Sequence, residues 1–151
     1  MKKSFNYKLK KDSAKGLKFG IVTSNWNKNI TDKLLRKTIE TLLSYGANKS
    51  DIHIQEVPGA FELIYAAKKI AKQKIDAIIV LGCIIQGKTP HFEYISHSVS
   101  LGIKDLNVLL NKPVIFGVLT TKNLTQAKKR SNGKENKGFE FAISAIEMAK
   151  I

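Results

Sequence analysis

The sequence predicts an α/β protein in which four parallel strands form a sheet between two layers of helices. Four short apolar runs, rich in β-branched residues, alternate with segments whose apolar residues recur at helical spacing. One of these runs, residues 75–85, is almost continuously apolar, which is typical of a strand buried on both faces of a parallel sheet. Strands that alternate with amphipathic helices through short connections indicate this class.

The first half of the chain contains two strand–helix units. The expected strands and helices, in order, are 17–24 (LKFGIVTS), 31–45, 51–57 (DIHIQEV) and a second helix, which starts from the tight turn 58–62 with Phe61 and Glu62 in its first turn and runs to about residue 72. Trp26 follows the first strand between polar residues. A tryptophan there is either core or the wall of a pocket, and its polar neighbours favour the wall.

The second half adds two further units and a final helix. The expected strands and helices, in order, are 75–85, 92–110, 113–120 (PVIFGVLT), 124–130 and 137–150. Because crossovers between parallel strands are right-handed, this order predicts a flavodoxin-like three-layer α/β/α sandwich. Ligands in such folds bind beyond the carboxyl ends of the strands, so the segments that follow the strands should meet at one edge.

Length and composition indicate one domain, residues 17–151, preceded by a basic arm, residues 1–16. No apolar run approaches the ~18 residues of a membrane span, and no apolar stretch of a secretory signal follows the basic N-terminus, so we expect no membrane partner. Cys83 is the single cysteine, which excludes an internal disulfide framework and fits a cytoplasmic protein. The cysteine and histidine spacing predicts no zinc site.

The formal net charge of +14 suits either a nucleic-acid binder or an enzyme that acts on anions. The basic residues are 24 lysines and only two arginines, Arg36 and Arg130, although arginine is the usual reader of guanine edges. Scattered lysines are more typical of a solvated surface, so we expect no nucleic-acid partner. The arm, with six lysines, is expected to be disordered alone or docked on another subunit, and a nucleic-acid arm is the alternative.

The stretch 81–93 (LGCIIQGKTPHFE) carries the clearest chemistry. An apolar strand breaks into a glycine-containing turn just before a helix, which is an arrangement that binds anions. Lys88 offers charge, Thr89 a hydroxyl, and His91 a group that gives and takes protons near neutral pH. Motifs for dinucleotides, nucleoside triphosphates and serine hydrolases are absent from the sequence. These residues predict a pocket for a phosphorylated small molecule, and a structural His91 is the alternative.

Five segments carry a resemblance to a known family. They are VPGAFEL at 57–63, LGCIIQGKTPHFEYI at 81–95, PVIFGVLTT at 113–121, NLTQAKKR at 123–130 and NKGFEFAISAIEMA at 136–149. The chain resembles the 6,7-dimethyl-8-ribityllumazine synthases of riboflavin biosynthesis. The resemblance implies a condensation of 5-amino-6-(D-ribitylamino)pyrimidine-2,4-dione with 3,4-dihydroxy-2-butanone 4-phosphate, which releases phosphate and water and uses no metal or organic cofactor.

The resemblance also assigns roles by position. These residues are His91 for proton transfer; Trp26, Ala60, Phe61, Glu62, Ile84, Ile85, Lys137 and a neighbouring subunit's copy of Phe116 for the pyrimidine and ribityl groups; and Gly87, Lys88, Thr89 and Arg130 for phosphate. Gln86 stands where an arginine is frequent and Lys88 where a small residue is common, so the charge has moved by two positions. A catalytically inactive lumazine or flavin carrier is the competing hypothesis.

Family members form homopentamers, which stop there, pair into decamers or assemble as an icosahedral capsid of twelve pentamers. The resemblance therefore implies a homo-oligomer with active sites between subunits, and riboflavin synthase as a protein partner that receives the product. The loop at 131–136 is one residue shorter than the usual pattern, and this loop is associated with the choice between capsid and free pentamer.

Overall fold

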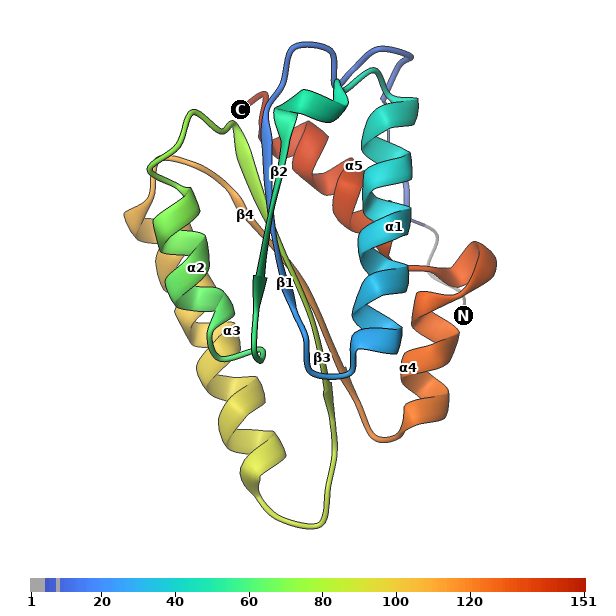
Figure 1. The fold of residues 1–151 in the computed structure, drawn as a ribbon, viewed down its shortest axis with the longest axis vertical. Helices are drawn as coiled ribbons and strands as arrows, with labels where there is room; N and C mark the ends of the chain where they lie inside the picture. The colour runs from blue at the N-terminus through green and yellow to red at the C-terminus, as the bar shows by residue number, and fades with distance from the viewer. Residues whose placement is uncertain (1–4, 8) are drawn as a thin grey trace.

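The computed structural model describes residues 5–7 and 9–151, and within them four strands and five α-helices follow the expected order (Figure 1). The strands and helices are β1 (Phe19–Ser24), α1 (Lys28–Ser44), β2 (Ile52–Val57), α2 (Leu63–Ile70), β3 (Ala77–Ile85), α3 (His91–Leu109), β4 (Val114–Thr121), α4 (Leu124–Ser131) and α5 (Gly138–Met148). Short 3₁₀ turns lie at Lys49–Asp51 and Gly133–Glu135.

The four strands form one parallel sheet in the order β2-β1-β3-β4. The ladder between β1 and β3 ends at the pair Thr23–Leu81, whereas the ladder between β3 and β4 continues to Ile85–Thr121. The last residues of β3 therefore project beyond the end of β1. This difference in length leaves room for a cavity above β1 at the carboxyl edge of the sheet.

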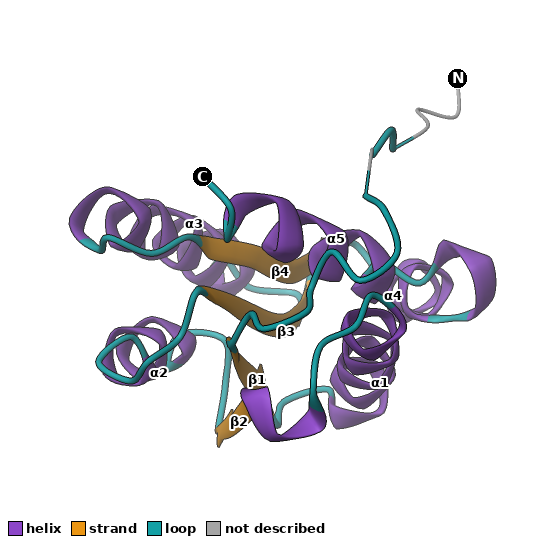
Figure 2. Cartoon of the chain, turned by 90° about the horizontal axis from the view of Figure 1, so that it is seen from above, coloured by secondary structure: helices purple, strands orange, loops and turns teal. Residues whose placement is uncertain are grey.

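The helices form two layers, with α2 and α3 on one face of the sheet and α1, α4 and α5 on the other (Figure 2). Alternate residues of β3 lie on opposite faces of the sheet. Ile79 and Leu81 pack with α1 and α5, and Ile78 and Val80 pack with α2 and α3. All four are fully buried. Since each buried side chain of this size stabilises the fold by about 1.5–3 kcal/mol, β3 anchors both layers. The predicted three-layer α/β/α fold with a doubly buried third strand is confirmed.

Four helices begin at residues other than those expected, and one of them, α5, begins at Gly138 rather than at residue 137. Helix α1 begins at Lys28 rather than at residue 31, and α3 begins at His91. Glu62 was expected in the first turn of the second helix, but it lies just before α2 and only its carbonyl oxygen joins the helical bonding, by accepting from Ala66 N. The cause at α1 is Thr31, whose Oγ1 donates to Ser24 O at 2.8 Å instead of capping a helix that starts after it.

The expectation that residues 1–16 are disordered or docked on another subunit is wrong for the last part of that segment. Ala14 is fully buried in the core beside α1 and α5, and its backbone N donates to Tyr45 O at 2.8 Å. Leu9 packs against the same cluster. Residues 1–4 and 8 lie outside the described residues, and the division into an arm and a domain stays a prediction. Across residues 5–7 and 9–151, no helix has both the length and the apolar character that crossing a bilayer requires.

Candidate active site

Four segments meet at the carboxyl edge of the sheet and enclose a cavity of about 550 Å³. They are the β1–α1 loop, the β2–α2 turn, the end of β3 and the first turn of α3 with the loop before it. The lining residues are Trp26, Asn27, Gly59, Ala60, Phe61, Glu62, Cys83, Ile84, Ile85, Gly87, Thr89, His91, Phe92 and Ile95. The topology therefore places the site where strand-end segments were expected to converge.

The β1–α1 loop carries Trp26, whose side chain is 73% exposed at the cavity wall. Backbone bonds hold the loop on the β2 side: Asn25 N donates to Val57 O at 2.8 Å and Trp26 N donates to Pro58 O at 3.0 Å. Asn27 holds the loop on the β3 side, where its Nδ2 donates to Cys83 O at 2.9 Å. A flat aromatic face is thus presented to the cavity from a backbone that is fixed on both sides.

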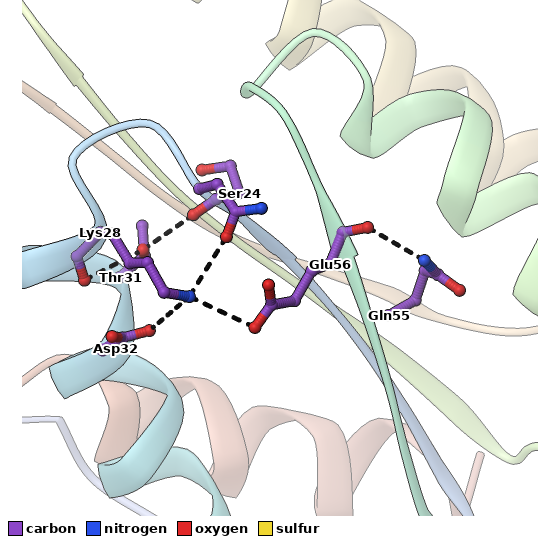
Figure 3. Close-up of polar contacts among 7 residues, drawn as sticks. Ser24, Lys28, Thr31, Asp32, Gln55 and Glu56 are labelled. Atoms are coloured by element: carbon purple, nitrogen blue, oxygen red, sulfur yellow. Dashed lines mark hydrogen bonds and ion pairs between the residues drawn. The ribbon is translucent and has the colours of Figure 1, made fainter.

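Lys28 adds a polar cluster on the outer side of this loop (Figure 3). Its Nζ lies 3.2 Å from Asn25 Oδ1, 3.2 Å from Glu56 Oε1 and 3.3 Å from Asp32 Oδ1. The bond to Glu56, followed by the bond to Asp32, raises the pKa of the Lys28 ammonium. This cluster joins the start of α1 to β2 and lies outside the cavity lining.

The β2–α2 turn brings three predicted residues to the cavity. Ala60 is buried beneath the surface, whereas Phe61 and Glu62 are exposed at the opening. A Cβ built on Gly59 would lie 2.9 Å from Glu62 Oε2, so the absent side chain leaves the space that the carboxylate occupies. The turn therefore places a carboxylate, which accepts several hydrogen bonds, next to an aromatic ring.

The end of β3 supplies an apolar part of the lining. Ile84 and Ile85 are half-buried there, and Cys83 is buried next to them. Burial raises the pKa of the Cys83 thiol to about 11, so the sulfur stays protonated and uncharged near neutral pH. This stretch favours a flat, weakly polar group over an ion.

The loop that leads to α3 has the features of an anion site. Gln86 N donates to Thr121 O at 2.9 Å, which ties the loop to the end of β4. His91 is the first residue of the 19-residue helix α3, and its backbone N–H points to Thr89 Oγ1 at 3.5 Å. Gly87 and Thr89 line the cavity, whereas the exposed Lys88 side chain does not. The amino end of a helix this long favours a bound negative charge.

Three other predicted residues lie away from this chain's cavity. Arg130 is exposed near the end of α4, and its Nη1 donates to Gln126 O at 3.3 Å. The Nζ of Lys137 pairs with Glu140 at 2.8 Å, just before α5. Phe116 lies on β4, the edge strand, with 39% of its side chain exposed. None of the three is a lining residue.

The structure adds lining residues that the sequence did not single out as site residues: Asn27, Gly59, Cys83, Phe92 and Ile95. Phe92 and Ile95 lie in the first two turns of α3, where both are half-buried and line the cavity. For Asn27, the sequence gives only a weak indication of a role in the site, namely that it is a polar residue between Trp26 and the first helix. Among residues 5–7 and 9–151, no group of three acidic, cysteine or histidine side chains is placed to hold a metal ion.

Comparison with known proteins gives a consistent result. A family model described as 6,7-dimethyl-8-ribityllumazine synthase matches residues 16–151. Curated proteins with that name are similar to this chain: one from Porphyromonas gingivalis is 49% identical over 137 residues, covering 89% of this chain and 85% of the relative. One from Cytophaga hutchinsonii is 51% identical over 132 residues, covering 86% and 83%. The chain therefore belongs to the 6,7-dimethyl-8-ribityllumazine synthase family.

Proposed function

We propose that the cavity is the active site in which this chain forms 6,7-dimethyl-8-ribityllumazine from the ribitylaminopyrimidinedione and 3,4-dihydroxy-2-butanone 4-phosphate. Family membership assigns the condensation to the chain. The observation that supports this site is that nine of the thirteen predicted residues line one cavity, although they come from segments far apart in the sequence. The four outside it are Lys88, Phe116, Arg130 and Lys137.

The apolar and aromatic walls bind the pyrimidine in this proposal. Trp26 presents an exposed ring face on which a flat heterocycle stacks, and Ile84 and Ile85 contact its other parts. Glu62 accepts hydrogen bonds from the ribityl hydroxyls, beside Ala60 and Phe61. A carboxylate over Gly59 suits a polyhydroxy chain, because each of its oxygens accepts more than one hydrogen bond.

The loop before α3 binds the phosphate, and His91 moves protons beside it. Formation of the Schiff base between the 5-amino group and the ketone expels one water, and elimination then breaks the carbon–oxygen bond to phosphate. Attack of the ribityl-bearing amine on the carbonyl that forms next closes the ring and expels a second water. Each step transfers a proton, which an imidazole at the start of α3 can accept and return. Gly87 and Thr89 hold the leaving phosphate at the helix terminus, and Lys88 adds charge from the surface.

We further propose that the site is completed by a neighbouring subunit in a homopentamer or in a capsid built from pentamers. Arg130, Lys137 and Phe116 do not line this chain's own cavity, which supports their action in another subunit's site. An exposed phenylalanine on an edge strand also fits a position that another subunit covers. The protein acts in the cytoplasm, and riboflavin synthase consumes its product.

The test is an assay of the purified protein with both substrates, followed through the absorbance and fluorescence of lumazine. The two substrates also react without enzyme, so the spontaneous rate is the reference. A rate above that background supports the proposal, and a Glu62→Gln variant should weaken binding of the pyrimidine substrate without unfolding the chain. A folded protein with only the background rate that still binds lumazine would instead favour the carrier hypothesis.

A further inference from the structure

Asn27 has an unusual conformation for a residue that precedes a helix. Its backbone is left-handed, with φ 59° and ψ 44°, although it is not a glycine. Asparagine before a helix normally caps it by accepting a hydrogen bond through Oδ1 from the first turn. Asn27 makes no such side-chain bond to α1. Asn27 therefore lacks the usual capping bond and has a backbone conformation that is unfavourable for a residue with a side chain. Residues with such backbone conformations are concentrated at functional sites.

The side chain of Asn27 is used across the sheet instead. Its Nδ2 donates to the Cys83 carbonyl at 2.9 Å, and Cys83 lies beyond the last β1–β3 pair, Thr23–Leu81. The Asn27 side-chain amide thereby supplies to the end of β3 a hydrogen bond that a longer β1 would otherwise donate from its backbone. Within the described part of the chain, this is the one side-chain hydrogen bond that joins residues 24–28 to β3.

Trp26 lies between the two attachments of this loop. The ring is 73% exposed, so packing holds it weakly, and the backbone on either side must fix it. Bonds to Val57 and Pro58 fix the loop on the β2 side, and Asn27 fixes it on the β3 side. The cavity lies between these two attachments and is lined by Asn27 itself.

We propose that Asn27 is a positioning residue that holds Trp26 at a fixed spacing from Ile84 and Ile85 and thereby sets the affinity for the pyrimidine substrate. This inference rests on the proposed stacking role of Trp26. Loss of the amide leaves the phosphate loop intact, because Gln86 attaches that loop to β4 independently. The effect should therefore fall on one substrate and not on the other.

Two variants remove the bond in different ways. Asn27→Gly keeps the left-handed backbone without strain, and Asn27→Asp keeps the shape but replaces the donor with an acceptor that faces the Cys83 carbonyl. Asn48→Gly is the matched control, since it removes an exposed asparagine bond, to Asp51, at the opposite end of the sheet. Thermal unfolding identifies any variant that fails to fold. Because the two replacements remove the bond in different ways, the test can still be made if one of them does not fold.

The chain contains one tryptophan, so its fluorescence reports on Trp26 alone. We expect both Asn27 variants to increase the amplitude of nanosecond depolarisation about twofold in time-resolved anisotropy. The KM for the pyrimidine should rise about tenfold, with kcat and the KM for the butanone phosphate within about twofold of wild type. Asn48→Gly should match the wild type in all of these measurements.

Two results would overturn the inference. One is wild-type depolarisation in both variants, which would show that the bond does not hold the ring. The other is a raised pyrimidine KM in Trp26→Ala beside a wild-type KM in both Asn27 variants. If Trp26→Ala itself leaves this KM unchanged, the proposed stacking role fails, and the inferred effect of Asn27 on affinity fails with it.

Discussion

His91 is the first residue of α3, so the imidazole proposed to transfer protons lies at the positive end of the helix dipole and lines the cavity. Cys83, eight residues earlier in the chain on β3, is the opposite kind of group, since burial keeps it uncharged near neutral pH. The two residues lie in different regions of one cavity: a polar region, which we propose binds the phosphate, and an apolar region, which we propose binds the pyrimidine ring. Each region leads to a separate measurement.

The His91→Ala variant should turn over more slowly but should not be inactive. We expect kcat to fall by about 10- to 100-fold, because general acid–base help is lost while binding still aligns two intrinsically reactive substrates. His53→Ala, which removes an exposed histidine from β2, is the control and should retain wild-type kcat. A folded His91→Ala protein that binds both substrates but has no rate above background would show that His91 does more than transfer protons.

Cys83 should resist alkylation in the folded protein. Its pKa is raised from an ordinary 9.0 to about 11 by burial, so at pH 8 the reactive thiolate is scarcer by roughly 100-fold than in the unfolded chain. Iodoacetamide incorporation, followed by mass spectrometry with and without urea, measures this ratio. Since the unfolded thiol ionises first, its contribution to stability is complete below pH 9 and is lost as the pH rises to about 11. Equal alkylation rates in both states would contradict the burial.

At the scale of elements, the sequence predicts the four strands and their order because apolar content and periodicity are local properties. Helix starts are less predictable, since the side chains of Thr31 and Asn27 donate to carbonyl oxygens of β1 and β3. The hydrogen bond from Asn27 to Cys83 forms because β3 extends past the end of its ladder with β1. The extent of that ladder depends on the register of the two strands, which is not a local property of the sequence. The packing of Ala14 likewise depends on Tyr45, which lies far along the chain.

The contact between α1 and α5 should be sensitive to one added methyl group. A Cβ on Gly138 would lie 2.5 Å from the backbone oxygen of Leu34, so Gly138→Ala must push the two helices apart. We expect the free energy of unfolding to fall by about 1–3 kcal/mol. Gly87→Ala is the control, because an added Cβ there meets no atom within 4 Å, and its stability should change by less than about 0.5 kcal/mol. Calorimetry on both variants tests the difference.

On the scale of the whole molecule, one chain holds the cavity but not all of its predicted partners. Arg130, Lys137 and Phe116 matched the family pattern by position, and no property of the single chain brings them to the cavity. Sequence reasoning identifies which residues matter more readily than which copy supplies them. Mixing two impaired variants addresses this point directly.

Variants His91→Ala and Arg130→Ala, unfolded and reassembled together, should be more active than either variant reassembled alone. If each site takes His91 from one chain and Arg130 from another, random co-assembly makes about a quarter of the sites fully intact. The mixture of His91→Ala with Thr89→Ala is the control, because both residues line the same chain's cavity and no site regains both. Recovery limited to the sum of the separate activities would show that the site is not shared in this way.

The burial of Cys83 makes the protein well suited to site-specific chemical labelling. It is the single cysteine, and near neutral pH the folded chain presents no reactive thiol. A cysteine introduced at Gly87 would have open space around its Cβ and would stand at the edge of the cavity. A dye, spin label or cross-linker attached there would report from one known position in every copy, with no need to remove a native cysteine first.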